Sequence, residues 1–137
     1  AVLYAATIWA SWEETRAPRR AVATEMTSLA IPTTDRLMTI DAGGFKYWTG
    51  RGGVVSPDDP LERILEVARA YDIRWLVLER RAVVEALAPV LRDDDRPAWI
   101  GPAVYTLPSG ASDGIPTLVL YPVCTTPGDA RCAEAGA

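Results

Sequence analysis

The sequence predicts a single α/β domain: a small, mostly parallel, Rossmann-like sheet with a βαβ core, flanked by helices and followed by a C-terminal antiparallel hairpin. Three observations support this. An apolar strand over residues 37–40 precedes a helix with one apolar face that runs from Pro60 to near Asp72. A second strand, residues 75–79, begins with a continuous apolar run over residues 75–78, as in strands buried on both faces. Two later apolar runs, 103–107 and 117–121, flank a turn-rich connection and predict the hairpin.

Length and composition limit the range of functions. A chain of 137 residues fits one domain, so residues 1–137 are treated as one unit. The net charge of −4 is spread along the chain, and no basic face suited to nucleic acid is visible. Histidine is absent, which removes the usual general base, the commonest zinc ligand and the Ser-His and Cys-His nucleophile systems. We expect no metal site and no cofactor in this chain.

The N-terminal residues form a lead-in to the domain. Residues 1–10, AVLYAATIWA, are apolar but too few to span a bilayer, which takes roughly 20 residues. They are either the first part of a buried helix or the outer end of a membrane helix, so residues 1–17 are assigned as a membrane-proximal lead-in. A regular helix is expected from Pro18 to Ala30, and Pro32 then biases the chain away from helix before the first strand.

The connection after the first strand is the best candidate for a binding site. It contains five glycines beside aromatic and basic residues, without a dinucleotide-binding or phosphate-cradling motif, and no helix is predicted to begin in it. Such rings and cations can stack on ligand rings and pair with anions, and ligands of open α/β sheets bind outside the carboxyl ends of the strands. The predicted substrate-binding residues are Asp41, Tyr47, Trp48, Thr49 and Arg51. Alternatively, Tyr47 and Trp48 fill the core and Arg51 pairs with Asp41 or Asp58.

The remaining elements offer little further chemistry. Val54-Val55 is expected to be a short strand, the helix of residues 60–72 should be capped by Asp59, and a further helix is expected over 82–92, kinked or shortened near its end by Pro89. Residues 93–95, three aspartates, are expected to be a solvated helix exit, because no glycine turn or later glutamate completes a calcium loop.

Two carboxylates, Asp41 and Glu79, follow adjacent parallel strands and could approach one another; two solvated strand ends are the alternative.

Cys124 and Cys132 flank the turn-rich segment TTPGDAR. Without histidine partners, two thiols at this spacing are not expected to bind metal. A disulfide is predicted, which implies an oxidising compartment, while two reduced, inert thiols are the alternative. Residues 124–137 would then form a disulfide-looped tail.

A longer pattern covers residues 18 to 108. Its segments are Met38-Thr39-Ile40-Asp41, Tyr47-Trp48-Thr49-Gly50-Arg51, Val54-Val55-Ser56-Pro57, Leu65-Glu66-Val67-Ala68-Arg69-Ala70-Tyr71, Trp75-Leu76-Val77-Leu78-Glu79 and Ala103-Val104-Tyr105. The pattern resembles the extracytoplasmic C-terminal domain of bacterial polytopic membrane glycosyltransferases, the GT-C superfamily related to protein mannosyltransferases and the lipid A aminoarabinose transferase. The sequence departs from that pattern in two places: Ala-Gly-Gly follows Asp41 where proline is expected, and Asp72 stands where glycine usually closes the helix.

The resemblance implies a membrane-embedded part of the same chain ahead of Ala1. Such enzymes transfer a sugar from a polyprenyl-phosphate carrier to an acceptor outside the cytoplasm, and their catalytic acid and any metal lie in the membrane part, so no catalytic residue is assigned here. This domain would be soluble and non-catalytic, at the extracytoplasmic face of the cell membrane. It would cap the active site or position the acceptor, with the polyprenyl-phosphate sugar or a glycan acceptor as partner. The alternatives are a stand-alone small-ligand-binding or regulatory α/β module, and a hydrolase that uses Asp41.

Overall fold

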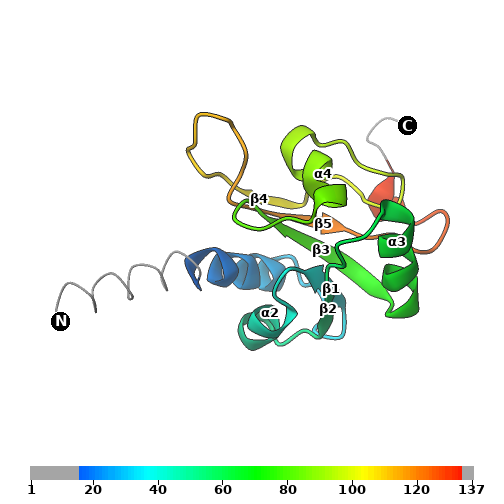
Figure 1. Cartoon of the computed structure of the whole chain (residues 1–137). Coiled ribbons are helices and arrows are strands. Elements are labelled where there is room, and N and C mark those ends of the chain that lie inside the picture. The colour runs from blue at the N-terminus through cyan, green and yellow to red at the C-terminus, as the bar shows by residue number, and fades with distance from the viewer. Residues whose placement is uncertain (1–15, 134–137) are drawn as a thin grey trace.

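Helices cover both faces of a five-stranded sheet in a computed structural model that describes residues 16–133 (Figure 1). The strand order is β2-β1-β3-β5-β4. The strands are β1 (Arg36–Thr39), β2 (Gly53–Val55), β3 (Ile73–Glu79), β4 (Tyr105–Leu107) and β5 (Leu118–Pro122). β1 pairs in parallel with β2 and β3, whereas β5 runs antiparallel to both β3 and β4. The predicted α/β class, its parallel βαβ core and its C-terminal hairpin are confirmed.

The helices divide between the two faces of the sheet. The N-terminal helix (residues 16–28) and α2 (Ala42–Thr49) lie on one face, and α3 (Leu61–Ala70) and α4 (Ala88–Asp93) lie on the other (Figure 1). Two 3₁₀ turns, η1 (Glu85–Leu87) and η2 (Ala130–Cys132), complete the elements described. Within residues 16–133, no helix combines the length and the apolar character that a membrane crossing requires.

β3 is central to both cores. Leu76 and Leu78 point to the side of α3 and α4, while Trp75 and Val77 point to the side of the N-terminal helix. Strands on both edges and helices on both faces therefore enclose β3, which explains its continuous apolar sequence.

A helix, α2, forms where the sequence predicted a glycine-rich loop, so that prediction is wrong. Asp41 is its N-cap and accepts a hydrogen bond from the Gly44 backbone N–H at 3.0 Å, and Gly50 ends the helix at a φ of 71°. A Cβ added at Gly44 would lie 2.5 Å from an Asp41 oxygen and 2.7 Å from Arg19 Nη1, so a larger residue there would displace the Asp41–Arg19 ion pair. Phe45 is completely buried in the core and holds α2 against the sheet.

Three helix boundaries differ from those predicted. The N-terminal helix is already formed at residue 16 and ends at 28, so Pro18 does not begin it. α3 has Pro60 as its N-cap without a side-chain hydrogen bond, so Asp59 is not the cap. The helix expected over 82–92 is shorter, because Pro89 lies in the first turn of α4, where a missing N–H costs nothing.

The predicted lead-in, except for its last two residues, and residues 134–137 of the predicted tail lie outside the described residues.

Candidate functional site

At the carboxyl ends of β1 and β3, Asp41 and Glu79 converge on one arginine. Arg19, from the N-terminal helix, places Nη1 2.5 Å from Asp41 Oδ2 and Nη2 3.6 Å from Glu79 Oε2. Arg19 and Glu79 are only 6% and 4% exposed, whereas 44% of the Asp41 side chain is accessible. The two carboxylates therefore share the guanidinium of Arg19 as a common partner, and Glu79 is buried, so the alternative of two solvated strand ends is wrong.

The surroundings move the pKa values of these two carboxyl groups in opposite directions. The hydrogen bond from the Gly44 N–H, supported by the charge of Arg19, keeps the pKa of Asp41 below its usual value. Burial raises the pKa of Glu79, although Arg19 and Arg81 oppose that shift. Carboxyl groups with separated pKa values can serve as acid and base. Here the shared cation, the guanidinium of Arg19, is itself buried and lies 5.4 Å from the centroid of the Phe45 ring. The cluster therefore holds the N-terminal helix against the sheet.

Tyr47 lies at the surface beside this cluster, and Trp48 is half-buried. Tyr47 is 81% exposed, and its ring meets Trp48 edge-on with 5.1 Å between the ring centroids. The guanidinium carbons of Arg16 and Arg20 lie 5.5 and 5.2 Å from the centroid of the Trp48 ring. The alternative in which both aromatic residues fill the core is therefore wrong. We call Arg16, Arg20, Lys46, Tyr47 and Trp48 the aromatic–basic patch.

Arg51, by contrast, is buried, with an exposed fraction of 3%. Its guanidinium donates to the carbonyl oxygens of Ile31, Pro32 (3.2 Å) and Thr49 (3.0 Å), and burial lowers its pKa. Neither Asp41 nor Asp58 is its partner in these bonds.

Thr49 is also buried, and its hydroxyl donates to the carbonyl of Phe45 at 2.7 Å. The Thr49 hydroxyl also accepts from the Arg51 backbone N–H at 3.1 Å, and the Arg51 side chain joins the end of α2 to the turn before β1. This placement favours structural roles for Thr49 and Arg51, and substrate binding by them stays a prediction.

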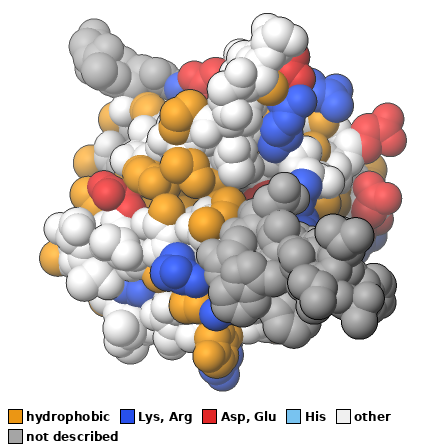
Figure 2. Space-filling view, turned by 90° about the vertical axis from the view of Figure 1, so that its left-hand side faces the viewer, with side chains coloured by type: hydrophobic (Ala, Val, Ile, Leu, Met, Phe, Trp, Pro, Cys, Tyr) orange, Lys and Arg blue, Asp and Glu red, His pale blue; other side chains and the backbone are white. Residues whose placement is uncertain are grey.

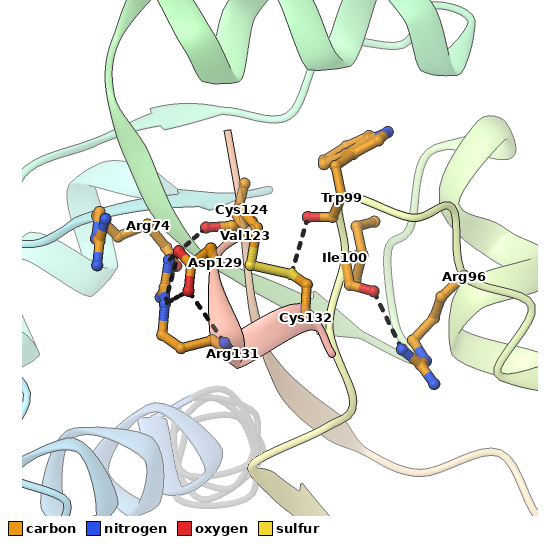
Figure 3. The surroundings of a disulfide bond; sticks show 9 residues. All are labelled: Arg74, Arg96, Trp99, Ile100, Val123, Cys124, Asp129, Arg131 and Cys132. Carbon is orange, nitrogen blue, oxygen red and sulfur yellow. Dashed lines mark hydrogen bonds and ion pairs between the residues drawn. A yellow bond between two sulfur atoms is a disulfide. The ribbon is translucent and has the colours of Figure 1, made fainter. Parts of the chain in front are cut away.

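The opposite end of the sheet carries the disulfide. Cys124 and Cys132 are bonded, which confirms the predicted pairing and is consistent with an oxidising compartment. Arg131 lies to one side of this bond and Trp99 to the other (Figure 3). Arg131 donates to the carbonyl oxygens of Arg74 (2.9 Å) and Val123 (2.6 Å), so the disulfide loop is fastened to β3 and β5.

A cavity of about 410 Å³ opens beside the disulfide. Its lining includes Trp99, Arg69 and the loop from Cys124 to Asp129. A second cavity, of about 370 Å³, is lined by Asp58, Asp59, Pro60, Glu85 and Ala86. Among residues 16–133, no group of three or more His, Cys, Asp or Glu side chains is arranged to hold a metal ion.

The sequence reasoning did not identify the three arginines of the N-terminal helix. Arg16 and Arg20 are spaced i, i+4, which places them on one helix face, and this signal was available. The partners of Arg19 are 22 and 60 positions away, and no local pattern marks them.

Comparison of the chain with known proteins gave no match among protein families, curated proteins or solved structures.

Proposed function

We propose that this chain is the extracytoplasmic domain of a polytopic membrane glycosyltransferase that transfers a sugar from a polyprenyl-phosphate carrier. In this proposal the domain is not catalytic by itself; it caps the active site of the membrane-embedded part or positions the acceptor. Its support from the sequence is the resemblance of residues 18 to 108 described above.

One structural observation carries the proposal: the chain enters the domain at the edge of the sheet where α/β proteins bind ligands. Arg19 contacts Asp41 and Glu79 at the carboxyl ends of β1 and β3, and Arg16 is one helical turn earlier. The described chain therefore begins beside this edge, which suits a domain that caps a preceding membrane part. The disulfide at the other end suits a position outside the cytoplasm.

The parent reading frame tests the proposal. Several apolar spans of roughly 20 residues are expected ahead of Ala1. In membranes containing the parent protein, a labelled sugar should pass from a polyprenyl-phosphate carrier to an acceptor, and excision of residues 16–133 should reduce that transfer. A parent chain without such spans would contradict the proposal, and unchanged transfer after the excision would contradict the capping role.

The cavity beside the disulfide favours a second candidate, a stand-alone small-ligand-binding module. Its volume of about 410 Å³ and the indole of Trp99 suit a small ligand. A reading frame that begins at this domain would favour this candidate over the first.

A hydrolase that uses Asp41 receives less support, because the lowered pKa of this carboxylate and its bond to Arg19 make it a weak base. Hydrolytic activity of the isolated chain that is lost in Asp41→Asn would support the hydrolase instead.

A further inference from the structure

We propose that the aromatic–basic patch binds the surface of an anionic membrane, with its cations on lipid phosphate groups and its rings at headgroup level. This inference rests on the proposed function, which places the chain beside a membrane, and it identifies the partner of one surface of the domain.

The first support is the construction of the patch. Arg16 and Arg20 both stack on Trp48, so two elements, the N-terminal helix and the last turn of α2, present their cations together around one indole. Lys46 is exposed on the same turn of α2, and Tyr47 projects beside it. Figure 2 shows Lys and Arg side chains beside hydrophobic ones in the lower part of the view, while the visible acidic side chains lie at mid-height and above, together with other Lys and Arg side chains.

The second support is chemical. Tyr and Trp rings are enriched where a membrane meets water, because they offer an apolar body and a polar tip. Guanidinium and ammonium groups pair with phosphate, and basic residues near an anionic leaflet add to its attraction.

The shape of the patch favours a broad partner over a small one. Binding sites for small molecules are concave. Tyr47 instead stands out from the surface with 81% of its area exposed, and neither of the cavities of about 410 and 370 Å³ is lined by a residue of the patch.

The path of the chain brings the patch within reach of a membrane. The apolar run of residues 1–10 ends six positions before Arg16. Six residues span at most roughly 22 Å even when fully extended. An apolar run seated in a bilayer would therefore keep Arg16, and the patch around it, close to the headgroups.

Vesicle binding of the 137-residue chain tests the proposal. Vesicles of phosphatidylcholine, with and without phosphatidylglycerol, are sedimented with wild type, with Arg16→Gln/Arg20→Gln, with Lys46→Gln and with Tyr47→Ala. Arg63→Gln and Tyr71→Ala are matched controls, because both side chains are exposed away from the patch. Every variant keeps the apolar lead-in, so binding by the lead-in cancels in the comparison, and unfolding midpoints identify any variant that has lost its fold.

Each cation lost is expected to weaken binding to anionic vesicles about fivefold, and the double variant roughly 25-fold. Tyr47→Ala should weaken binding to both kinds of vesicle, added salt should weaken wild-type binding, and the controls should stay within about twofold of wild type. If Lys46→Gln and Tyr47→Ala bind anionic vesicles as tightly as the controls do, the proposal is wrong. It is also wrong if a water-soluble sugar phosphate displaces the chain from the vesicles, because the patch would then be a ligand site.

These outcomes separate the two proposals. Suppose that vesicle binding depends on the patch but the parent protein lacks membrane spans. The glycosyltransferase proposal would then be refuted, and the proposal that the patch binds lipid would stand. If the parent protein has such spans but vesicle binding is unchanged by the patch substitutions, only the proposal that the patch binds lipid would be refuted.

Discussion

Replacing Arg51 with alanine distinguishes a structural role for this residue from a ligand-binding one. The side chain is buried and its guanidinium donates to three backbone carbonyls, those of Ile31, Pro32 and Thr49. Hydrogen bonds with a charged partner contribute about 1.5 kcal/mol each at the low end, so the loss of three should lower the free energy of unfolding by roughly 4.5 kcal/mol. Domains are usually stable by only about 5 to 15 kcal/mol, so this loss would be a large share.

The measurement is equilibrium unfolding in urea at neutral pH, followed by circular dichroism. Arg51→Lys should also be strongly destabilised, because one ammonium group cannot reproduce the planar fork of donors. The control is Arg63→Ala, which removes an exposed i, i+3 pair with Glu66 and should cost less than about 1 kcal/mol. An Arg51→Ala variant within about 1 kcal/mol of wild type, with an unchanged urea dependence, would show that these bonds do not matter to the fold.

Three further changes follow from the packing and the charges. Gly53→Ala should cost roughly 2 kcal/mol, because its Cβ would lie 2.2 Å from the Leu37 carbonyl oxygen; Gly52→Ala, which meets open space, is the control, and equal urea midpoints would contradict the reasoning. Burial raises the pKa of Glu79, so ionisation of its carboxyl group opposes folding, and the stability that this group contributes at acid pH is lost as pH rises through the raised pKa. The stability of Glu79→Gln relative to wild type should therefore increase from acid to neutral pH, and a decrease would refute this sign. Cys132→Ser should lower the free energy of unfolding by roughly 2 to 3 kcal/mol, since the bond closes a short loop; reduction of the wild type should reproduce the loss, and no loss would contradict it.

The sheet was predictable because the central strand is continuously apolar, whereas the other strands are short apolar runs between turn residues. A strand enclosed on both faces and both edges is expected to be apolar along its length, and residues 75–78 are; Glu79 follows at the strand end. The short strand at Val54-Val55 and the hairpin follow from apolar runs bounded by turn residues.

α2 was not predictable from local preference. Two glycines in its first turn each cost roughly 1 kcal/mol in a helix interior, which argues for a loop. Tertiary packing outweighs that cost: Phe45 is buried against the sheet, and Asp41 caps the first turn. Once the helix is known, the exposure of its side chains follows from its period, because Phe45 and Thr49 share the inner face while Tyr47 points outward.

The candidate site was predicted only in part, for the same reason. Asp41, Tyr47 and Trp48 were identified from residue type, but the inward turn of Arg51 and the ion pairs of Arg19 depend on contacts between distant parts of the chain. Sequence alone cannot show which of several arginines a fold buries.

β5 is the last of the described strands along the chain, yet it occupies an inner position between β3 and β4. While the protein is being synthesised, β3 therefore keeps one hydrogen-bonding edge open until residues as far as Pro122 have emerged. In this state the nascent chain exposes an apolar strand with an unpaired edge. It therefore depends on rapid synthesis of β5 or on a chaperone to avoid aggregation. Truncation before Leu118 should accordingly yield aggregates instead of a smaller folded domain.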